Sequence, residues 1–174
     1  AASGGHFEIL KYLHDNGCPW DTNTCSSAVY RGHLECLKYT HEKGCSMDES
    51  TCCYAAQEGH LECLKYAHEK GCPWDELTCT SAAYTGRLEC LKYAHEEGCH
   101  LADDICCSSA GGGQCECLQY LHEIGCPWNE ITCSPSSSVG HFQFRKSSHA
   151  YGLYWDPNTL STFFLKCHIP CLQS

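Results

Sequence analysis

The sequence predicts an all-α, helix-turn-helix solenoid of about six repeats, and three observations support this fold class. First, one motif recurs every 27 residues without insertion or deletion, which places glycine at six equivalent positions: Gly5, Gly32, Gly59, Gly86, Gly113 and Gly140. Second, the repeat contains apolar residues at helical spacing. Third, a glycine follows each of the two predicted helices, where a left-handed C-terminal turn favours it. Fixed self-similarity at this length is typical of stacked repeat proteins.

The best-preserved repeat spans residues 48–75 and contains two short predicted helices. Asp48 is a favourable N-cap for the first helix, which we expect to end at Gly59. The second helix is predicted to begin near His60 and to end at Gly71, shortly before a proline that prevents its continuation. Each helix has about ten residues, fewer than the ~12–15 at which an isolated helix is marginal in water. Stacking on neighbouring repeats must therefore stabilise both helices.

The second helix of this repeat has an inward face and a solvated face. Helical spacing predicts that the following residues point inward: Leu61, Cys63, Leu64, Ala67 and His68. The charged residues of the same helix lie on the opposite face. Trp74 follows in the loop, where we expect it to fill a core position.

The repeat weakens toward the C-terminus. Residues 111–113 are three consecutive glycines, which are poor helix formers, and Pro135 interrupts the next first helix. We expect residues 1–156 to form the repeat array, with a truncated first repeat and a degenerate sixth. Residues 157–174 are predicted to be a degenerate half-repeat or cap. Because the chain enters the repeat midway, we expect the array to be part of a longer one.

The repeated residues resemble those of the ankyrin repeat family. Each repeat reads Ala-Ala-x-x-Gly-His-x-Glu-x-x-Lys and then Gly-Cys-Pro-Trp-Asp, with variations, which is similar to the AAxxGHxEIVKLLLxxGADVN core of that family. The usual ankyrin period is about 33 residues, against 27 here, and the missing residues fall where the β-hairpin finger would be. The resemblance is to a short ankyrin-like variant with a GCPWD loop. It implies a solenoid with shortened or absent fingers that acts as a protein–protein interaction module, adaptor or scaffold.

Composition argues against several other functions. The net charge of −10 opposes binding to nucleic acid or to an anionic membrane, which requires a basic surface. No apolar run approaches the ~18 residues of a membrane span. The sequence has no Gly-rich phosphate loop and no nucleophile elbow, and a residue that recurs in every repeat is a poor candidate for a unique catalytic centre. We therefore expect a non-catalytic protein without cofactor, located inside the cell in the cytoplasm.

Nineteen cysteines raise the alternative of a metal- or redox-responsive protein. Every full repeat contains His-x3-Cys-x6-Cys, and zinc accepts thiolate and imidazole ligands together. A Cys3His zinc site could thus form from four residues and their equivalents: Cys63, His68, Cys72 and Cys79. We expect packing instead, because free cysteine is among the most buried residue types and the repeat lacks the CxxC knuckle of common zinc sites. Disulfides between cysteine columns are a further possibility, although reduced thiols suit a cytosolic protein better.

The recurring histidines have a simpler interpretation. One column lies one turn before each helix-ending glycine: His14, His41, His68, His95, His122 and His149. Histidine at a helix C-terminus complements the dipole and can reach the last carbonyls. A second group follows the glycine at the start of the second helix, where the family resemblance implies structural contacts between repeats: His6, His33, His60 and His141.

One edge of the predicted solenoid is the candidate partner-binding site. Stacking would align acids at the starts of the first helices: Asp48, Glu49, Asp75, Glu76, Asp103 and Asp104. Exposed first-helix residues would lie beside them: Tyr30, Tyr54, Gln57 and Tyr84. These residues could bind a protein with a basic surface, using aromatic anchors. Two alternatives stay open: the acids are only N-caps and dipole partners, or the array is a structural spacer within a larger assembly.

Overall fold

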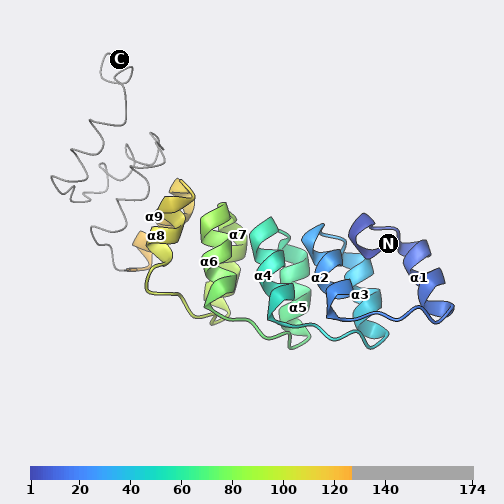
Figure 1. The fold of residues 1–174 in the computed structure, drawn as a ribbon. Helices are drawn as coiled ribbons and strands as arrows, with labels where there is room; N and C mark the ends of the chain where they lie inside the picture. Colours follow the sequence, from blue (N-terminus) through green and yellow to red (C-terminus); the bar gives the residue numbers. More distant parts are fainter. Residues whose placement is uncertain (127–174) are drawn as a thin grey trace, which may run out of the picture.

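The computed structural model describes residues 1–126, and this part of the chain is a row of stacked helix pairs (Figure 1). A short 3-10 helix, η1, precedes nine α-helices in this range. Their bounds are η1 Ala2–Gly4, α1 Phe7–Asp15, α2 Thr22–Tyr30, α3 Leu34–Glu42, α4 Glu49–Glu58, α5 Leu61–Glu69, α6 Glu76–Thr85, α7 Leu88–Glu96, α8 Ile105–Gly111 and α9 Cys115–Glu123. The expected sixth repeat and the half-repeat or cap at 157–174 lie outside the described residues.

The helices form two parallel rows. The first helices of the repeats (α2, α4, α6 and α8) stack on one another, and the second helices (α1, α3, α5, α7 and α9) form the other row. The connecting loops run along a common edge (Figure 1). Residues 1–126 contain no β-strand, so the predicted all-α solenoid without β-hairpin fingers is confirmed over the part that the structure describes.

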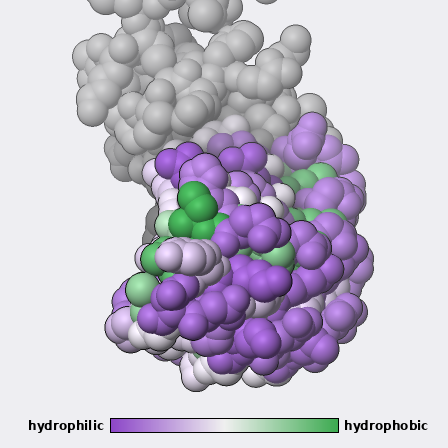
Figure 2. All heavy atoms as spheres, turned by 90° about the vertical axis from the view of Figure 1, so that its right-hand side faces the viewer, coloured by the Kyte–Doolittle hydropathy of each residue, from purple (hydrophilic) through white to green (hydrophobic). Residues whose placement is uncertain are grey.

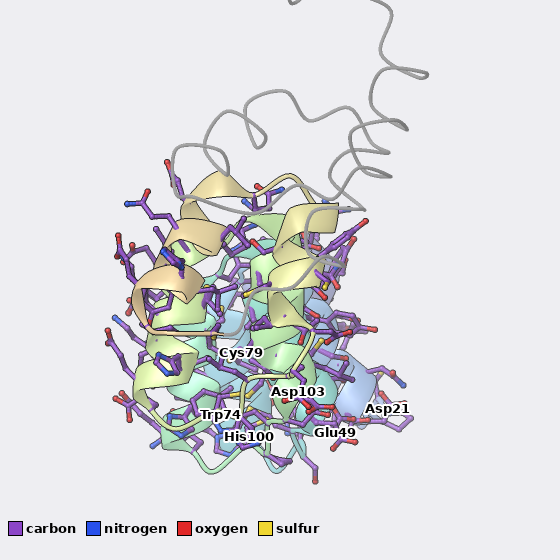
Figure 3. All side chains as sticks on the ribbon, turned by 90° about the vertical axis from the view of Figure 1, so that its left-hand side faces the viewer. Asp21, Glu49, Trp74, Cys79, His100 and Asp103 are labelled. Atoms are coloured by element: carbon purple, nitrogen blue, oxygen red, sulfur yellow. The ribbon has the colours of Figure 1, made fainter. Side chains whose placement is uncertain are left out.

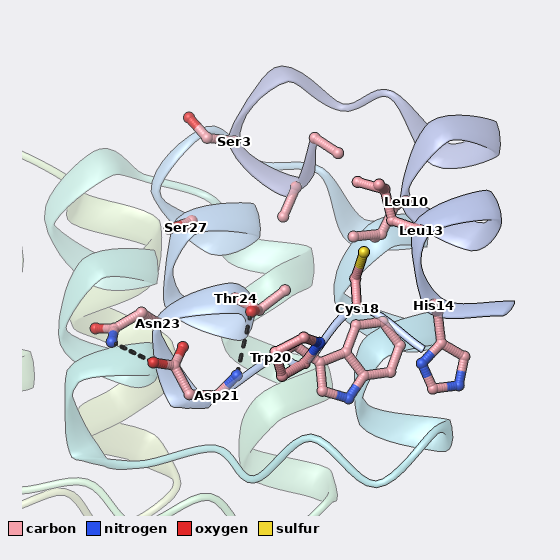
Figure 4. Close-up of a pocket in the computed structure, with 13 residues that line it drawn as sticks. Ser3, Leu10, Leu13, His14, Cys18, Trp20, Asp21, Asn23, Thr24 and Ser27 are labelled. Carbon is pink, nitrogen blue, oxygen red and sulfur yellow. Dashed lines mark hydrogen bonds between the residues drawn. The ribbon is translucent and has the colours of Figure 1, made fainter. Parts of the chain in front are cut away.

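Aspartate caps begin the first helices as predicted. The Asp75 side chain accepts a hydrogen bond from the Leu77 backbone N–H at 3.0 Å. Asp21 forms a capping box with Thr24, whose hydroxyl accepts from the Asp21 backbone N–H at 3.4 Å (Figure 4). Before α8, the position equivalent to the capping Asp48 and Asp75 is occupied by Ala102. This helix begins only at Ile105. The prediction that this helix opens with Asp103 and Asp104 is therefore wrong, because the side chain that caps the others is missing.

Cysteine, alanine and leucine fill the space between the two rows. Leu37, Leu64 and Leu91 are completely buried, at equivalent positions of three successive repeats. The described cysteines of the Cys63 column and of the Cys79 column are at most 2% exposed: Cys36, Cys63, Cys90 and Cys117, and Cys25, Cys52, Cys79 and Cys106. Burial raises the pKa of the Cys63 thiol to about 11. These thiols are therefore protonated at neutral pH and pack as small apolar side chains, as the sequence predicted.

His68 does not belong to the buried inward face that its spacing suggested. It is half-buried, stacks on the Trp74 indole with ring centroids 3.8 Å apart, and its Nδ1 lies 3.1 Å from the Tyr93 hydroxyl of the next repeat. The same histidine–tyrosine hydrogen bond joins His41 to Tyr66 at 3.0 Å. It recurs between His95 and Tyr120 at 2.8 Å. His41, His68 and His95 thus link successive repeats through tyrosine hydroxyls, a role that the sequence analysis did not find.

Removing one of these hydroxyls tests their contribution to stability. We expect Tyr93→Phe to lower the free energy of unfolding by about 1 kcal/mol, because the half-buried His68 loses its hydrogen-bond partner. Tyr84→Phe is the matched control, since Tyr84 is 55% exposed and its hydroxyl makes no hydrogen bond within residues 1–126. Urea unfolding followed by circular dichroism measures both variants. Equal losses in the two would show that the histidine–tyrosine bond does not stabilise the stack.

Candidate protein-binding face

The first helices present a row of tyrosines to solvent. Tyr30, Gln57 and Tyr84 occupy the same position of three successive repeats, and Tyr54 lies one turn earlier in α4. The Tyr30, Tyr54 and Tyr84 side chains are 42%, 38% and 55% exposed. The rings of Tyr30 and Tyr54 meet edge-on with centroids 5.9 Å apart. The three predicted tyrosines therefore lie on one surface, built from α2, α4 and α6.

Gln57 differs from the expectation of an exposed residue. It is half-buried, because α6 packs beside α4 and covers its C-terminal turn. The Gln57 carbonyl accepts hydrogen bonds from the Thr85 hydroxyl at 2.8 Å and from Arg87 Nε at 3.3 Å. Its side-chain amide donates to Glu58 at 2.9 Å. Gln57 thus ties two repeats together at the edge of the tyrosine row.

A pocket of about 340 Å³ opens between α4, α6 and α8 next to Tyr84. Its lining residues are Gln57, Thr80, Ser81, Tyr84, Thr85 and Ser108. Ser81 in α6 and Ser108 in α8 are at the position equivalent to Tyr54 in α4. Because serine is smaller than tyrosine, it leaves this volume open. Sequence reasoning missed this pocket, although the change from tyrosine to serine at one register is visible in the sequence. Its volume is at the low end of the ~300–1,000 Å³ of ligand pockets, enough for a single large side chain.

The acidic edge contains two kinds of carboxylate. Asp48 and Asp75 are N-caps: Asp48 accepts from the Ser50 hydroxyl at 2.5 Å, and Asp75 caps α6 as described above. Glu49 and Glu76 follow the caps and are exposed, and their side chains make no hydrogen bond or salt bridge within residues 1–126. The same is true of Asp103 and Asp104. The capping interpretation therefore applies fully to Asp75, whereas Asp48 occupies the N-cap position without a side-chain bond to the helix backbone. The side chains of the four other acids are free to meet a partner.

These acids form a continuous edge with few cations nearby. Seen along the array, Asp21, Glu49 and Asp103 project at the same edge of the first-helix row, whereas Cys79 lies between the two rows (Figure 3). Segments 21–31, 48–58, 75–85 and 102–111 together carry eight carboxylates and a single cation, Arg31. We call the tyrosine row, the pocket beside it and this acidic edge the first-helix face.

The second-helix row differs, because each of its lysines in α3, α5 and α7 pairs with a glutamate of the same helix. Salt bridges three residues apart join Lys38 to Glu35 at 3.3 Å and Lys65 to Glu62 at 3.2 Å. An equivalent pair follows in α7 at 3.6 Å, and the histidine–tyrosine bonds occupy the same row. No helix among the described residues is both long enough and apolar enough to cross a membrane.

A second pocket, of about 330 Å³, lies at the N-terminal end of the array. Leu10, Leu13, Cys18 and Trp20 contribute to its lining (Figure 4). The surface at this end is largely hydrophilic with small hydrophobic areas (Figure 2), and Leu13 is 36% exposed. Cys18 is exposed here, whereas its equivalents in the following three repeats are buried. The pocket lies beside α1 and is separate from the tyrosine row.

The four candidate zinc ligands do not converge. The Cys72 thiol donates to the Asp48 carbonyl at 3.0 Å, His68 lies between Trp74 and Tyr93, and Cys79 contacts Cys99 of the following loop rather than Cys72. Within residues 1–126, no group of three or more histidine, cysteine or acidic side chains is arranged to hold a metal ion.

Two comparisons with known proteins agree with this repeat solenoid. A family model described as ankyrin repeats (many copies) matches residues 1–39 and 52–95. Over these segments the chain belongs to the ankyrin repeat family. The crystal structure of the human ASB11 ankyrin repeat domain is similar in fold, with a TM-score of 0.72, 16% sequence identity, and coverage of 98% of this chain and 97% of that chain. No curated protein matches the sequence. Ankyrin repeats are generally protein–protein interaction modules and are typically non-enzymatic.

Proposed function

We propose that this chain is a non-catalytic adaptor or fixed subunit that binds a protein partner on its first-helix face. The observation that carries the proposal is the tyrosine row beside carboxylates that have no partner of their own. Tyrosine supplies large contact area at low entropic cost and is enriched among the residues that dominate binding energy. Tyr84, at the mouth of the pocket, is the central anchor.

The charge of this face specifies the chemistry of the partner. Glu49, Glu76 and Asp103 would meet lysine or arginine side chains, and the pocket beside Tyr84 would accept one apolar or aromatic side chain. Charges at the rim of an interface mainly orient the partner and speed its association, while the buried anchor supplies affinity. The partner surface is therefore expected to be basic around one protruding side chain.

Site-specific photo-crosslinking in a native extract tests which face binds. A photoreactive phenylalanine analogue at position 84 is expected to give a discrete crosslinked protein that mass spectrometry identifies. The same analogue at position 89, exposed on α7 in the second-helix row, is the control and should not give that product. Crosslinking at 89 but not at 84 would contradict the proposal, and crosslinking at neither would favour a spacer role.

Charge reversal on the acidic edge should weaken binding of the identified partner. We expect Glu49→Lys combined with Glu76→Lys to reduce affinity about tenfold, mainly through slower association, with a weaker dependence on salt. Each change also removes an acid from the first turn of a helix, which costs about 0.3–1 kcal/mol of stability. Surface plasmon resonance at two salt concentrations measures the rates.

The matched control for this variant is Glu69→Lys with Glu96→Lys. Both glutamates are exposed at the ends of α5 and α7, so that the net charge changes equally on the other row. If both double variants lose the same affinity, the effect is one of overall charge and the acidic edge has no specific role.

A further inference from the structure

We propose that the first-helix face binds an extended segment of its partner, in the polyproline II conformation, with lysine or arginine at every third position. The inference rests on the proposed function and deepens it, because it names the kind of chain that the face accepts. The segment would run across the first helices in the direction in which they stack. Its basic side chains would point to the acidic edge, and its prolines would pack on the tyrosine row.

The carboxylates of the face repeat at the spacing of the stacked helices. Glu49, Glu76 and Asp103 occupy the same position of three successive repeats, and all three are exposed. Glu49 and Asp103 project at the same edge (Figure 3). α4 packs on α6, and α6 packs on α8, and the axes of packed helices lie ~8–10 Å apart. A partner that crosses the helices therefore meets one carboxylate every ~8–10 Å.

An extended polyproline II chain matches this spacing. It rises ~3.1 Å per residue with about three residues per turn, so that every third side chain points the same way at intervals of ~9.3 Å. On a β-strand, the side chains of one side recur every ~6.6 Å and lose register within one repeat. An α-helix lying in the same direction matches only at every seventh residue, at ~10.5 Å. The spacing therefore favours polyproline II or a helix over a strand.

The tyrosine hydroxyls favour polyproline II over a helix. The side chains of Tyr30, Tyr54 and Tyr84 are exposed, and their hydroxyls make no hydrogen bond within residues 1–126. Each hydroxyl needs an acceptor when a partner covers it. Polyproline II has no internal hydrogen bonds, so its carbonyls can accept from tyrosine, whereas the carbonyls inside an α-helix are bonded to its own N–H groups. Aromatic-lined surfaces bind proline-rich segments in this way.

Thr80 marks the path of the segment between the two rows. It lies one helical turn from Glu76 on one side and from Tyr84 on the other, so that a chain above it is ~6 Å from each along α6. The Thr80 hydroxyl donates to the Glu76 carbonyl at 2.8 Å, and the Thr85 hydroxyl donates to the Gln57 carbonyl at 2.8 Å. These hydroxyls belong to residues that line the pocket beside Tyr84. Because their protons are already bonded, a proline or another apolar side chain can enter the pocket without leaving a buried donor unpaired.

Fluorescence anisotropy with labelled synthetic peptides and the 174-residue chain tests the spacing. The probe is a short peptide that repeats the triplet Arg-Pro-Ser. We expect it to bind about tenfold more tightly than isomers of the same composition in which the arginines are contiguous or alternate, because only the triplet engages successive repeats at once. Equal affinities would reduce the effect to net charge and overturn the proposal. Tighter binding of a helical peptide with arginine at every seventh position would overturn it as well.

Two pairs of variants test the residues assigned to the site. Tyr84→Phe should weaken binding of the triplet peptide about fivefold, because the ring loses its hydrogen bond to a peptide carbonyl, and Glu76→Gln should weaken it similarly. The matched controls are Tyr12→Phe and Glu69→Gln on the second-helix row, where Tyr12 is 67% exposed and Glu69 is also exposed. Circular dichroism checks that each variant is folded. Unchanged affinity in the first pair, or equal losses in both pairs, would overturn the proposal.

Photo-crosslinking at position 84 separates this inference from the proposed function, because it captures a partner of any conformation. If that crosslink forms and the peptide isomers bind equally, the partner is not an extended basic segment, whereas the first-helix face remains its binding site. If no crosslink forms at position 84, both proposals fail.

Discussion

Replacing Leu64 by alanine is expected to lower the free energy of unfolding by about 2–5 kcal/mol, one of the two largest effects of the changes considered. Leu64 is completely buried in α5, between the equivalent leucines of the repeats on either side. Truncation removes its transfer free energy and leaves a cavity that the rigid helix pairs can only partly close. Because each repeat contacts only its neighbours, a cavity in a central repeat weakens two interfaces at once. Urea unfolding followed by far-UV circular dichroism measures the loss.

Leu77→Ala is the matched control for this prediction. Leu77 lies in α6 and is 57% exposed, so that the same truncation should change stability by no more than about 0.5 kcal/mol. A comparable loss in both variants would mean that the leucine between the rows does not stabilise the stack.

The second large effect is expected from Gly32→Ala. Gly32 has a φ of 72°, in the left-handed region where an L-residue costs roughly 1–2 kcal/mol. An added Cβ would also lie 2.6 Å from Nδ1 of His60 in the following repeat. Displacing that ring should cost a further ~1–3 kcal/mol, the range found for overpacked sites. The free energy of unfolding measures the sum.

Two further variants separate these contributions. Gly71 has a similar φ of 78°, but a Cβ there would meet no atom within 4 Å, so that Gly71→Ala should show only the backbone cost. In a His60→Ala background, Gly32→Ala should become as mild as Gly71→Ala. If its cost is unchanged in that background, the contact between Gly32 and His60 plays no part in the loss.

The repeat, the helix boundaries and the core were predictable because they depend on local chemistry within one repeat. Asp48, Gly59 and Gly71 mark helix ends through capping and left-handed turns, and the structure confirms all three. The burial of the Cys63 column followed from the preference of free cysteine for the interior. The later start of α8 could also be predicted from the sequence, since Ala102 stands where the other first helices have an aspartate.

The exact 27-residue period is the reason that contacts between repeats could not be predicted from the sequence. Every column of a repeat keeps a constant spacing to every other column, so spacing cannot identify which columns touch. The zinc hypothesis joined Cys72 to the nearby Cys79, whereas in the structure the Cys72 thiol donates to the Asp48 carbonyl. The hydrogen bond from His68 to Tyr93 was missed for the same reason. The pocket beside Tyr84 was detectable only from the small residue at one register, where Ser81 and Ser108 stand and only α4 carries a tyrosine, Tyr54, among the first helices of residues 1–126.

The bonds between successive repeats have a direction. The glycine after each of α2, α4 and α6 is covered by a side chain of the next repeat, as Gly32 is by His60, and His68 bonds forward to Tyr93. Such interfaces are heterologous: the two sides present different residues, and a twofold axis cannot relate them. A further unit with the same residues would extend the array head-to-tail and leave the existing contacts intact. Duplication or loss of whole 27-residue units can thus change the length of this protein without redesign of its interfaces.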